Sequence, residues 1–300
     1  MPRSTWQDLP AAVRAAIEHE TGTVLRTESP TAGRNSDFSA TLHTTAGPVF
    51  CKAIADAEGS RGHIHRREIA VNPWLPRSVA PRLRWHTEAE GWLVLGFDHV
   101  PGEHADLSPA SPDLNAVATT VTNLAGSLAQ CPVEAPRLAE QWERLSAWRR
   151  MRPRPDIHLD EWTADHLDEL CDWEARAVEL ADRDSLVHTD LHSYNILVSA
   201  DRAQVVDWAW SRTGAAAIDV AFLIARLVAA GHPPAAAEHW ANDLAVWRAT
   251  PPAAKTAYAV AIWGIWTYKN TEQPRPLWDT LIPAACAWAR HRLQTTRVSA

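Results

Sequence analysis

The secondary-structure pattern changes once along the chain, and this single change limits the folds that its 300 residues can adopt. In the first third, short runs with β-strand character are separated by turn-forming segments. Beyond that point, apolar residues recur at helical spacing in most segments. This order predicts an α+β protein with two lobes, a small β-rich N-terminal lobe and a larger helical C-terminal lobe.

The predicted elements place the boundary between the lobes near residue 98. Turn-forming residues cluster at 98–104, so we assign residues 1–98 to an N-terminal lobe of antiparallel sheet plus helix, and residues 99–300 to a helical C-terminal lobe. Strands are predicted at 23–28, 38–44, 48–54 and 91–97. Helices are predicted at 9–17, 63–71, 114–128, 138–149, 161–181, 218–230, 234–248, 254–268 and 277–293. Short extended segments are expected within the helical lobe at 186–188, 196–199 and 204–207.

Composition excludes several classes of protein. The formal charge of −7 and the pI near 6.0 leave no basic field for nucleic acid or an anionic membrane. The four cysteines never form a C-x-x-C pair, which argues against a zinc knuckle and a disulfide framework. No apolar stretch has the length of a signal peptide or a membrane span. We therefore expect a cytoplasmic protein without a nucleic-acid or membrane partner, and composition leaves its oligomeric state open.

The segment 188–195 carries the strongest chemical signal. Asp190 follows His188 by two residues and precedes Asn195 by five, and this H-x-D-x-x-x-x-N spacing lets a short loop present a carboxylate and an amide oxygen to one volume. Asp207 follows Asn195 by twelve residues, and a hairpin between them would bring the two side by side. Two oxygen ligands of this kind suit Mg²⁺ that is bound jointly by protein and nucleotide phosphates.

The N-terminal lobe offers a cation for phosphate groups. Only three of the 29 cationic residues are lysines, and Lys52 lies in a predicted strand, where a lysine is costly unless it is paired. The helix predicted after that strand supplies Glu68 as the partner. Glu58 is nearer in sequence but lies in a segment that favours a loop. The competing interpretation is a solvated lysine at a strand edge.

These groups match what phosphoryl transfer requires of a protein: a cation on the phosphates, magnesium ligands and a carboxylate near the attacking hydroxyl. A segment between two predicted strands adds backbone N–H groups that can bind phosphate oxygens, at Gly33, Asn35 and Ser36. The pattern therefore predicts an ATP-dependent kinase in which Asp190 is the catalytic carboxylate.

The same residues resemble the aminoglycoside phosphotransferase and choline kinase branch of the protein-kinase-like fold. The resemblance covers about residues 24–230 and is strongest at 186–198, 205–208 and 214–221. It implies the two-lobed protein-kinase-like fold, with ATP and Mg²⁺ as cofactors and a hydroxyl of a small molecule as the acceptor. An antibiotic, an amino sugar or another metabolite would fit this acceptor class, and resistance to an antibiotic is one role that the family suggests.

The resemblance also implies a role for each motif residue. Asp190 would be the base or hydroxyl-orienting group, Asn195 and Asp207 would bind magnesium, and Lys52 would hold phosphates. Asp219 matches the aspartate that braces the catalytic loop from the start of the next helix. His188 is expected to support the same loop by hydrogen bonding to its backbone.

Two further regions acquire expected roles from the resemblance. The segment that joins the lobes would bind adenine through its backbone, at Phe97, Asp98 and Val100. The late helix in which the family builds its acceptor site carries Trp263 and Trp266, on which a flat or sugar-like acceptor could stack. Most of the 16 tryptophans are expected in the core instead.

Several features depart from the family pattern or leave alternatives open. The loop at Gly33 has one glycine where protein kinases have three, and no glycine follows Asp207 as in the D-F-G motif. The second acid that choline kinases often carry just beyond that aspartate is also missing. Residues 251–300 contain two acids against six cations, whereas aminoglycoside kinases commonly crowd acids into this region.

The competing functional interpretations concern the motif itself. His188 and His192 could form a chelating triplet with Asp190, which would suggest a metallohydrolase, but the chain lacks further paired ligands. A catalytically silent nucleotide-binding regulator and a kinase acting on Ser or Thr of a peptide also remain. The favoured hypothesis is an ATP-dependent O-phosphotransferase acting on a small molecule.

Overall fold

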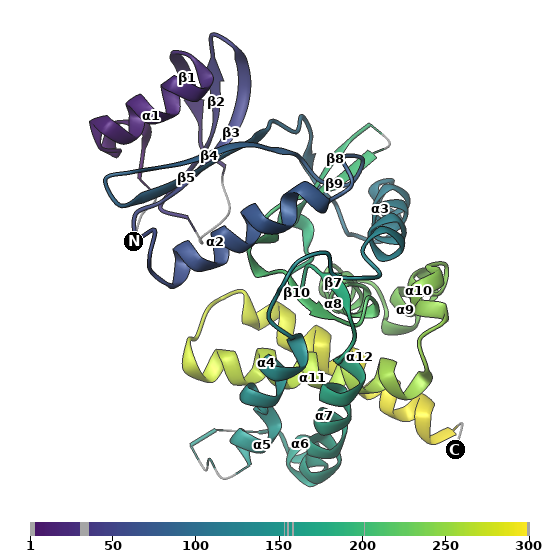
Figure 1. Cartoon of the computed structure of the whole chain (residues 1–300). Coiled ribbons are helices and arrows are strands. Elements are labelled where there is room, and N and C mark those ends of the chain that lie inside the picture. The colour runs from purple at the N-terminus through teal and green to yellow at the C-terminus, as the bar shows by residue number, and fades with distance from the viewer. Residues whose placement is uncertain are drawn as a thin grey trace. The chain divides into compact units, whose positions relative to one another are not determined.

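The computed structural model describes residues 4–30, 36–152, 154, 156–157, 159–200 and 202–298. It divides into two compact units (Figure 1). The first unit contains Met1–Ala105 with Ser193–Ser211, and the second contains Asp106–His192 with Arg212–Ala300. This division differs from a single boundary at residue 98, because residues 193–211 contain a hairpin that pairs with a strand of the first unit.

An antiparallel sheet of five strands forms the centre of the first unit, in the order β1-β2-β3-β5-β4 (Figure 1). The strands are β1 (Val24–Glu28), β2 (Phe38–Thr44), β3 (Gly47–Ile54), β4 (Leu83–Ala89) and β5 (Trp92–Asp98). β4 is not among the strands expected from the sequence. It is an edge strand whose residues alternate between exposed and half-buried, so it lacks the buried apolar run that marks β3 and β5.

The two faces of this sheet have different helical partners. α1 (Ala11–Thr21) shares a core with one face, which includes Cys51 and Ala53 of β3. Ile54 belongs to a second cluster against which Ile69 of α2 (Ser60–Val71) packs. Because successive side chains of a strand point to opposite faces, Lys52 lies on the α2 face. Two 3₁₀-helices, η1 (Trp6–Asp8) and η2 (Asn72–Trp74), precede α1 and follow α2.

A smaller sheet of order β6-β8-β9 completes the first unit. Its strands are β6 (Glu103–His104), β8 (Ile196–Ser199) and β9 (Arg202–Val205), and the 3₁₀-helices η3 (Ser193–Asn195) and η4 (Trp208–Trp210) flank the hairpin. Ile196 lies opposite Val205, and the N–H of Val206 donates to the carbonyl oxygen of Asn195 at 2.9 Å. The hairpin expected between Asn195 and Asp207 is therefore confirmed.

The second unit is helical, apart from one strand pair. β7 (Ser185–Val187) pairs with β10 (Arg212–Gly214). The helices are α3 (Asp113–Ser127), α4 (Leu138–Leu145), α5 (Ala147–Met151), α6 (Glu161–Asp165), α7 (Leu167–Ala181), α8 (Ala217–Ala229), α9 (Pro234–Asn242), α10 (Ala245–Arg248), α11 (Pro252–Glu272) and α12 (Trp278–Val298). The helices predicted at 138–149, 161–181 and 234–248 each form two separate helices in the structure. The first divides at Ser146, whose left-handed backbone (φ 36°) ends α4.

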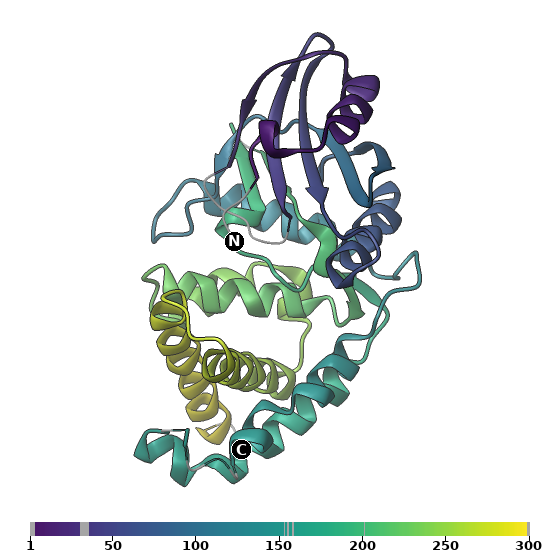
Figure 2. The same cartoon turned by 90° about the vertical axis from the view of Figure 1, so that its left-hand side faces the viewer.

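The core of the second unit is built around α8, α11 and α12, which pack against one another (Figure 2). α8 is apolar on nearly all sides, as expected for a helix surrounded by protein. The α+β class expected from the sequence is confirmed. Within the described residues, no helix combines the length and apolar character needed to cross a membrane.

Candidate active site

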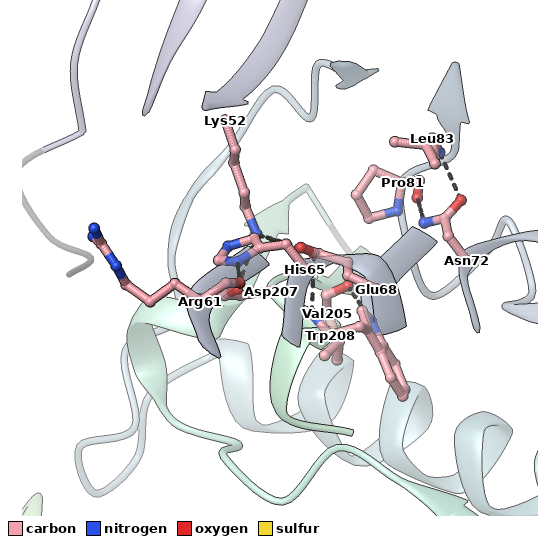
Figure 3. A network of polar contacts seen from close by, with 10 residues as sticks. All are labelled: Lys52, Arg61, His65, Glu68, Asn72, Pro81, Leu83, Val205, Asp207 and Trp208. Carbon is pink, nitrogen blue, oxygen red and sulfur yellow. Dashed lines mark hydrogen bonds and ion pairs between the residues drawn. The ribbon is translucent and has the colours of Figure 1, made fainter. Parts of the chain in front are cut away.

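A buried ion cluster in the first unit contains Lys52, Glu68 and Asp207 (Figure 3). The ammonium of Lys52 donates to both carboxylate oxygens of Glu68 at 3.0 Å and to Oδ1 of Asp207 at 2.9 Å. Lys52 is 7% exposed and Glu68 is 2% exposed. Lys52 is thus a buried and paired lysine, not a solvated one, and α2 supplies the expected partner.

The protonation of Lys52 follows from these two carboxylates. Burial acts to lower the pKa of Lys52, but the charges and hydrogen bonds of Asp207 and Glu68 outweigh burial, so the pKa is raised. The ammonium also lies 5.5 Å from the centre of the Phe97 ring, a distance that permits a cation–π interaction. The cation is therefore permanent at physiological pH, as binding of phosphate requires.

A backbone contact holds the carboxylate of Glu68 in place. Oε1 of Glu68 accepts a hydrogen bond from the backbone N–H of Trp208 at 3.1 Å, which connects α2 to the segment after β9. Asp207 itself has a left-handed backbone, with φ of 65°. Non-glycine residues rarely adopt this conformation, and they do so mostly where a functional constraint maintains it.

His65 is a member of this cluster that the sequence analysis did not identify. A ring nitrogen of His65 lies within 4.8 Å of a carboxylate oxygen of Glu68 and of a carboxylate oxygen of Asp207 (Figure 3). Nδ1–H donates to the carbonyl oxygen of Arg61 at 2.9 Å, and the buried Nε2 has no hydrogen-bond partner among the described residues. Its pKa is lowered by burial and then by the charge of Lys52. The signal available in the sequence was the i, i+3 spacing of His65 and Glu68 on one helix.

The groups that suit magnesium are an amide and a carboxylate at the open end of the β8–β9 hairpin. Asn195 is 7% exposed, and the Asp207 side chain is 21% exposed. Hard oxygen donors with partial solvent access fit a cation that keeps several of its own waters. The alternative set of His65, Glu68 and Asp207 fits less well, because both carboxylate oxygens of Glu68 are already bonded to the Lys52 ammonium.

The loop that carries Asp190 belongs to the second unit and is anchored by Asp219 at the start of α8. The two carboxylate oxygens of Asp219 accept the backbone N–H groups of His188 at 2.9 Å and Thr189 at 2.8 Å. The N–H of Asp190 donates to Nδ1 of His188 at 3.2 Å. Thr189 has a left-handed backbone with φ of 66°. These contacts present the Asp190 side chain, which is 39% exposed, on a fixed loop.

Burial affects the charge of Asp219. Its pKa is raised by desolvation, which the charge of His188 and the two backbone N–H groups oppose. Both N–H bonds favour the ionised carboxylate. Asp219 and His188 thus both hydrogen-bond to the backbone of this loop, and their supporting roles in catalysis stay predictions.

Two polar side chains lie beside Asp190 within its own unit. Arg226 of α8 places a guanidinium nitrogen 3.9 Å from Oδ1, and Nε2 of His192 lies 3.6 Å from Oδ2. The sequence analysis did not single out Arg226. It lies two helical turns after Asp219 on α8, so the periodicity of that helix was the available signal.

The stacking role expected for Trp263 and Trp266 is not supported, because both rings are buried. They are 3% and 4% exposed. Trp263 packs edge-on against Trp148 with ring centroids 4.7 Å apart, and Trp266 packs near Phe222 and Trp278. The Arg226 guanidinium also lies 5.0 Å from the Trp266 ring. Both tryptophans belong to the core of the helical unit and present no open face to an acceptor.

The remaining expected nucleotide contacts occupy different environments. Phe97 is 4% exposed and lies at the end of β5. The backbone N–H of Asp98 donates to the carbonyl oxygen of Arg82 at 2.8 Å, so this donor is already hydrogen-bonded within the protein. Val100 is half-buried. Ser36 is half-buried just before β2, whereas Gly33 and Asn35 lie outside the described residues.

A paired lysine on an antiparallel sheet unit and a braced aspartate on a helical unit are groups that phosphoryl transfer employs, and they place this protein among the kinase-like phosphotransferases. A comparison with family models agrees. Residues 33–254 match the model described as the phosphotransferase enzyme family, and the chain belongs to that family. No curated protein matches the chain in a sequence search.

Solved structures show the same fold at low sequence identity. The aminoglycoside phosphotransferase APH(4)-Ia, in a ternary complex with ADP and hygromycin B, aligns with a TM-score of 0.59 and 15% identity over 95% of this chain and 97% of that chain. An aminoglycoside phosphotransferase from Alicyclobacillus acidocaldarius gives 0.63 and 13% over 95% and 94%. Choline kinase LicA from Streptococcus pneumoniae gives 0.63 and 13% over 94% and 96%.

Proposed function

We propose that this phosphotransferase moves the γ-phosphoryl group of ATP to a hydroxyl of a small molecule. The observation that carries the proposal is the ion cluster of Lys52, Glu68 and Asp207, together with an Asp190 loop anchored by Asp219. The nucleotide complex of a structural neighbour supports a nucleotide as donor. The hygromycin B complex of one structural neighbour and the choline kinase among the others support a small molecule as the acceptor.

Each residue has a defined part in the proposed reaction. The acceptor oxygen attacks the γ-phosphorus, the bond from the γ-phosphorus to the β–γ bridging oxygen breaks, and ADP leaves. Asp190 accepts the hydrogen bond of the attacking hydroxyl and takes up its proton. Lys52 donates to phosphate oxygens. Mg²⁺, which Asn195 and Asp207 would hold, supplies charge neutralisation on the phosphates.

The proposal is tested by incubating the protein with ATP, Mg²⁺ and a library of hydroxylated antibiotics, sugars and peptides, and by locating the phosphate on the product. Asp190→Asn should lower kcat by about a hundredfold or more, because the hydroxyl loses its proton acceptor. The Kd for ATP should stay unchanged. Asp168→Asn, which alters an exposed acid of α7, is the matched control.

Three outcomes would contradict parts of this proposal. Full activity of the Asp190→Asn variant would exclude the assigned role of that residue. Binding of ATP without turnover of any acceptor would favour a nucleotide-binding regulator. Phosphate found on peptides alone would favour a Ser/Thr kinase.

A further inference from the structure

The environment of Asp190 contains cations that the phosphate-handling residues do not use. Arg226 is the first of them. Its side chain is 15% exposed, its Nε atom is buried without a hydrogen-bond partner, and none of its N–H groups donates to another described residue. A guanidinium has five N–H donors, and burying them without acceptors costs free energy. Among the described residues, the ion contact with Asp190 at 3.9 Å and the ring of Trp266 at 5.0 Å offset part of the cost of burying the guanidinium.

Lys269 provides a second cation from the last turn of α11. Its ammonium forms no hydrogen bond or ion pair with another described residue, and the residue is exposed to solvent. Its pKa is lowered by desolvation, and the charges of Arg212, Arg226 and Arg275 act in the same direction, against Asp190. Lys269 lies three residues after Trp266 on α11, and the Arg226 guanidinium lies 5.0 Å from the Trp266 ring, so Lys269 and Arg226 lie on the same side of this helix.

Asp190 has two cationic neighbours within its own unit, Arg226 and Lys269. The negative charge of Asp190 acts to raise the pKa of both Arg226 and Lys269. Arg212 of β10, which is 8% exposed, and Arg275, which follows α11, act electrostatically on Lys269. We call Arg212, Arg226, Lys269 and Arg275 the cationic cluster. Arg226 contacts Asp190, and Lys269 lies among charged neighbours that include both residues, so these two cations attract anions beside the proposed proton acceptor.

We propose that the acceptor is an anionic molecule, one that carries a carboxylate or a phosphate ester in addition to its reactive hydroxyl, and that Arg226 and Lys269 bind this anionic group beside Asp190. This inference rests on the proposed function. A guanidinium bonds an oxyanion through two parallel N–H groups, and the nearby ammonium adds a point charge. A polyamine acceptor such as an aminoglycoside would instead meet repulsion from the cationic cluster.

The test uses acceptors matched in scaffold. Glucose, glucuronate, glucose 6-phosphate and glucosamine share the pyranose ring and carry, in turn, no charge, a carboxylate, a phosphate ester and an ammonium group. Equivalent sets are built on the scaffold of the best acceptor from the library. The anionic member should show a kcat/KM at least tenfold above the neutral member, and the amine should be the poorest substrate. The carboxylate and phosphate members distinguish the two sources of negative charge.

Two variants connect this preference to the named residues. Lys269→Gln should raise the KM for the anionic acceptor by about tenfold, with little effect on the neutral acceptor or on the KM for ATP. Lys255→Gln removes a positive charge from the same helix, fourteen residues earlier. It should change neither the KM for the acceptors nor the KM for ATP. Arg226→Gln should have a larger effect in the same direction. Because Lys269 is exposed, its variant remains informative even if the Arg226 variant fails to fold.

The outcomes separate the two proposals. Phosphorylation of amines or neutral molecules as efficiently as of anions would overturn the inference and leave the kinase activity standing. A rise in the KM for ATP alone in both variants would also overturn it, because the cations would then serve the nucleotide. Failure to phosphorylate any acceptor would count against the proposed function itself.

Discussion

At the scale of single residues, the site depends on charges that are buried together. Lys52 would be costly in its strand without partners, and its position on the α2 face brings it to Glu68 and Asp207. Asp190 differs from Lys52, because its side chain is partly exposed and its loop is held by backbone hydrogen bonds. A buried, paired cation is held rigidly, whereas the partly exposed carboxylate of Asp190 is open to contact with a ligand.

Removal of the buried cation should destabilise the protein. Lys52→Met leaves the carboxylates of Glu68 and Asp207 together without a counter-charge, and we expect a loss of about 3 kcal/mol in the free energy of unfolding. Urea denaturation measures this loss. Lys255→Met is the control for removal of a lysine and should change stability by less than about 1 kcal/mol.

The double variant Lys52→Met with Glu68→Met extends this test. It should recover part of the lost stability, because one of the two uncompensated carboxylates is then absent. A double variant less stable than the single one would show that the carboxylate of Glu68 stabilises the fold mainly through Trp208.

At the scale of elements, close approach between helices explains a glycine of α11. A Cβ atom on Gly264 would lie 2.4 Å from Nε1 of Trp148. That indole nitrogen donates to the carbonyl oxygen of Val260 at 3.0 Å, one turn earlier on α11. α5 and α11 thus meet at a contact that has no room for a methyl group.

Gly264→Ala should therefore lower the free energy of unfolding by about 1–3 kcal/mol, since the indole must shift and its hydrogen bond weakens. Thermal or urea unfolding would register the change. Gly126→Ala in α3 is the matched control, because no atom lies within 4 Å of its added Cβ. It should be neutral or stabilising by up to about 1 kcal/mol. Equal destabilisation by both substitutions would contradict the packing explanation.

At the scale of the whole molecule, ligand binding and stability are linked. A ligand that binds only the folded state at a hundred times its Kd stabilises that state by about 2.7 kcal/mol. We expect ATP with Mg²⁺ to raise the Tm accordingly, and EDTA to remove most of that rise because Asn195 and Asp207 need the cation to hold the phosphates. Calorimetry with and without EDTA measures both effects.

Asp207→Asn serves as the variant for this linkage. It should reduce the stabilisation by ATP and Mg²⁺, whereas Asp168→Asn should preserve it. A rise in Tm that is the same in EDTA would show that the nucleotide binds without the metal and would contradict the assignment of Asn195 and Asp207.

Much of the architecture and of the phosphate-handling set could be read along the chain. Strand alternation in 48–54 and helical spacing after it were sufficient to pair Lys52 with Glu68, because both elements are short and consecutive. The spacing from Asn195 to Asp207 was sufficient to predict a hairpin. Local periodicity carries this information, since each step spans few residues.

Only the tertiary structure decided what meets across long separations. It buries Trp263 and Trp266 in the core, although their sequence context resembles an acceptor helix. It also brings Arg226 to Asp190 and adds His65 to the ion cluster. Periodicity assigns a residue to a face of its own helix, but which element covers that face depends on the packing of the whole unit. The sequence by itself therefore determined phosphoryl transfer as the expected chemistry, while the packing decided which charges surround the proposed acceptor position.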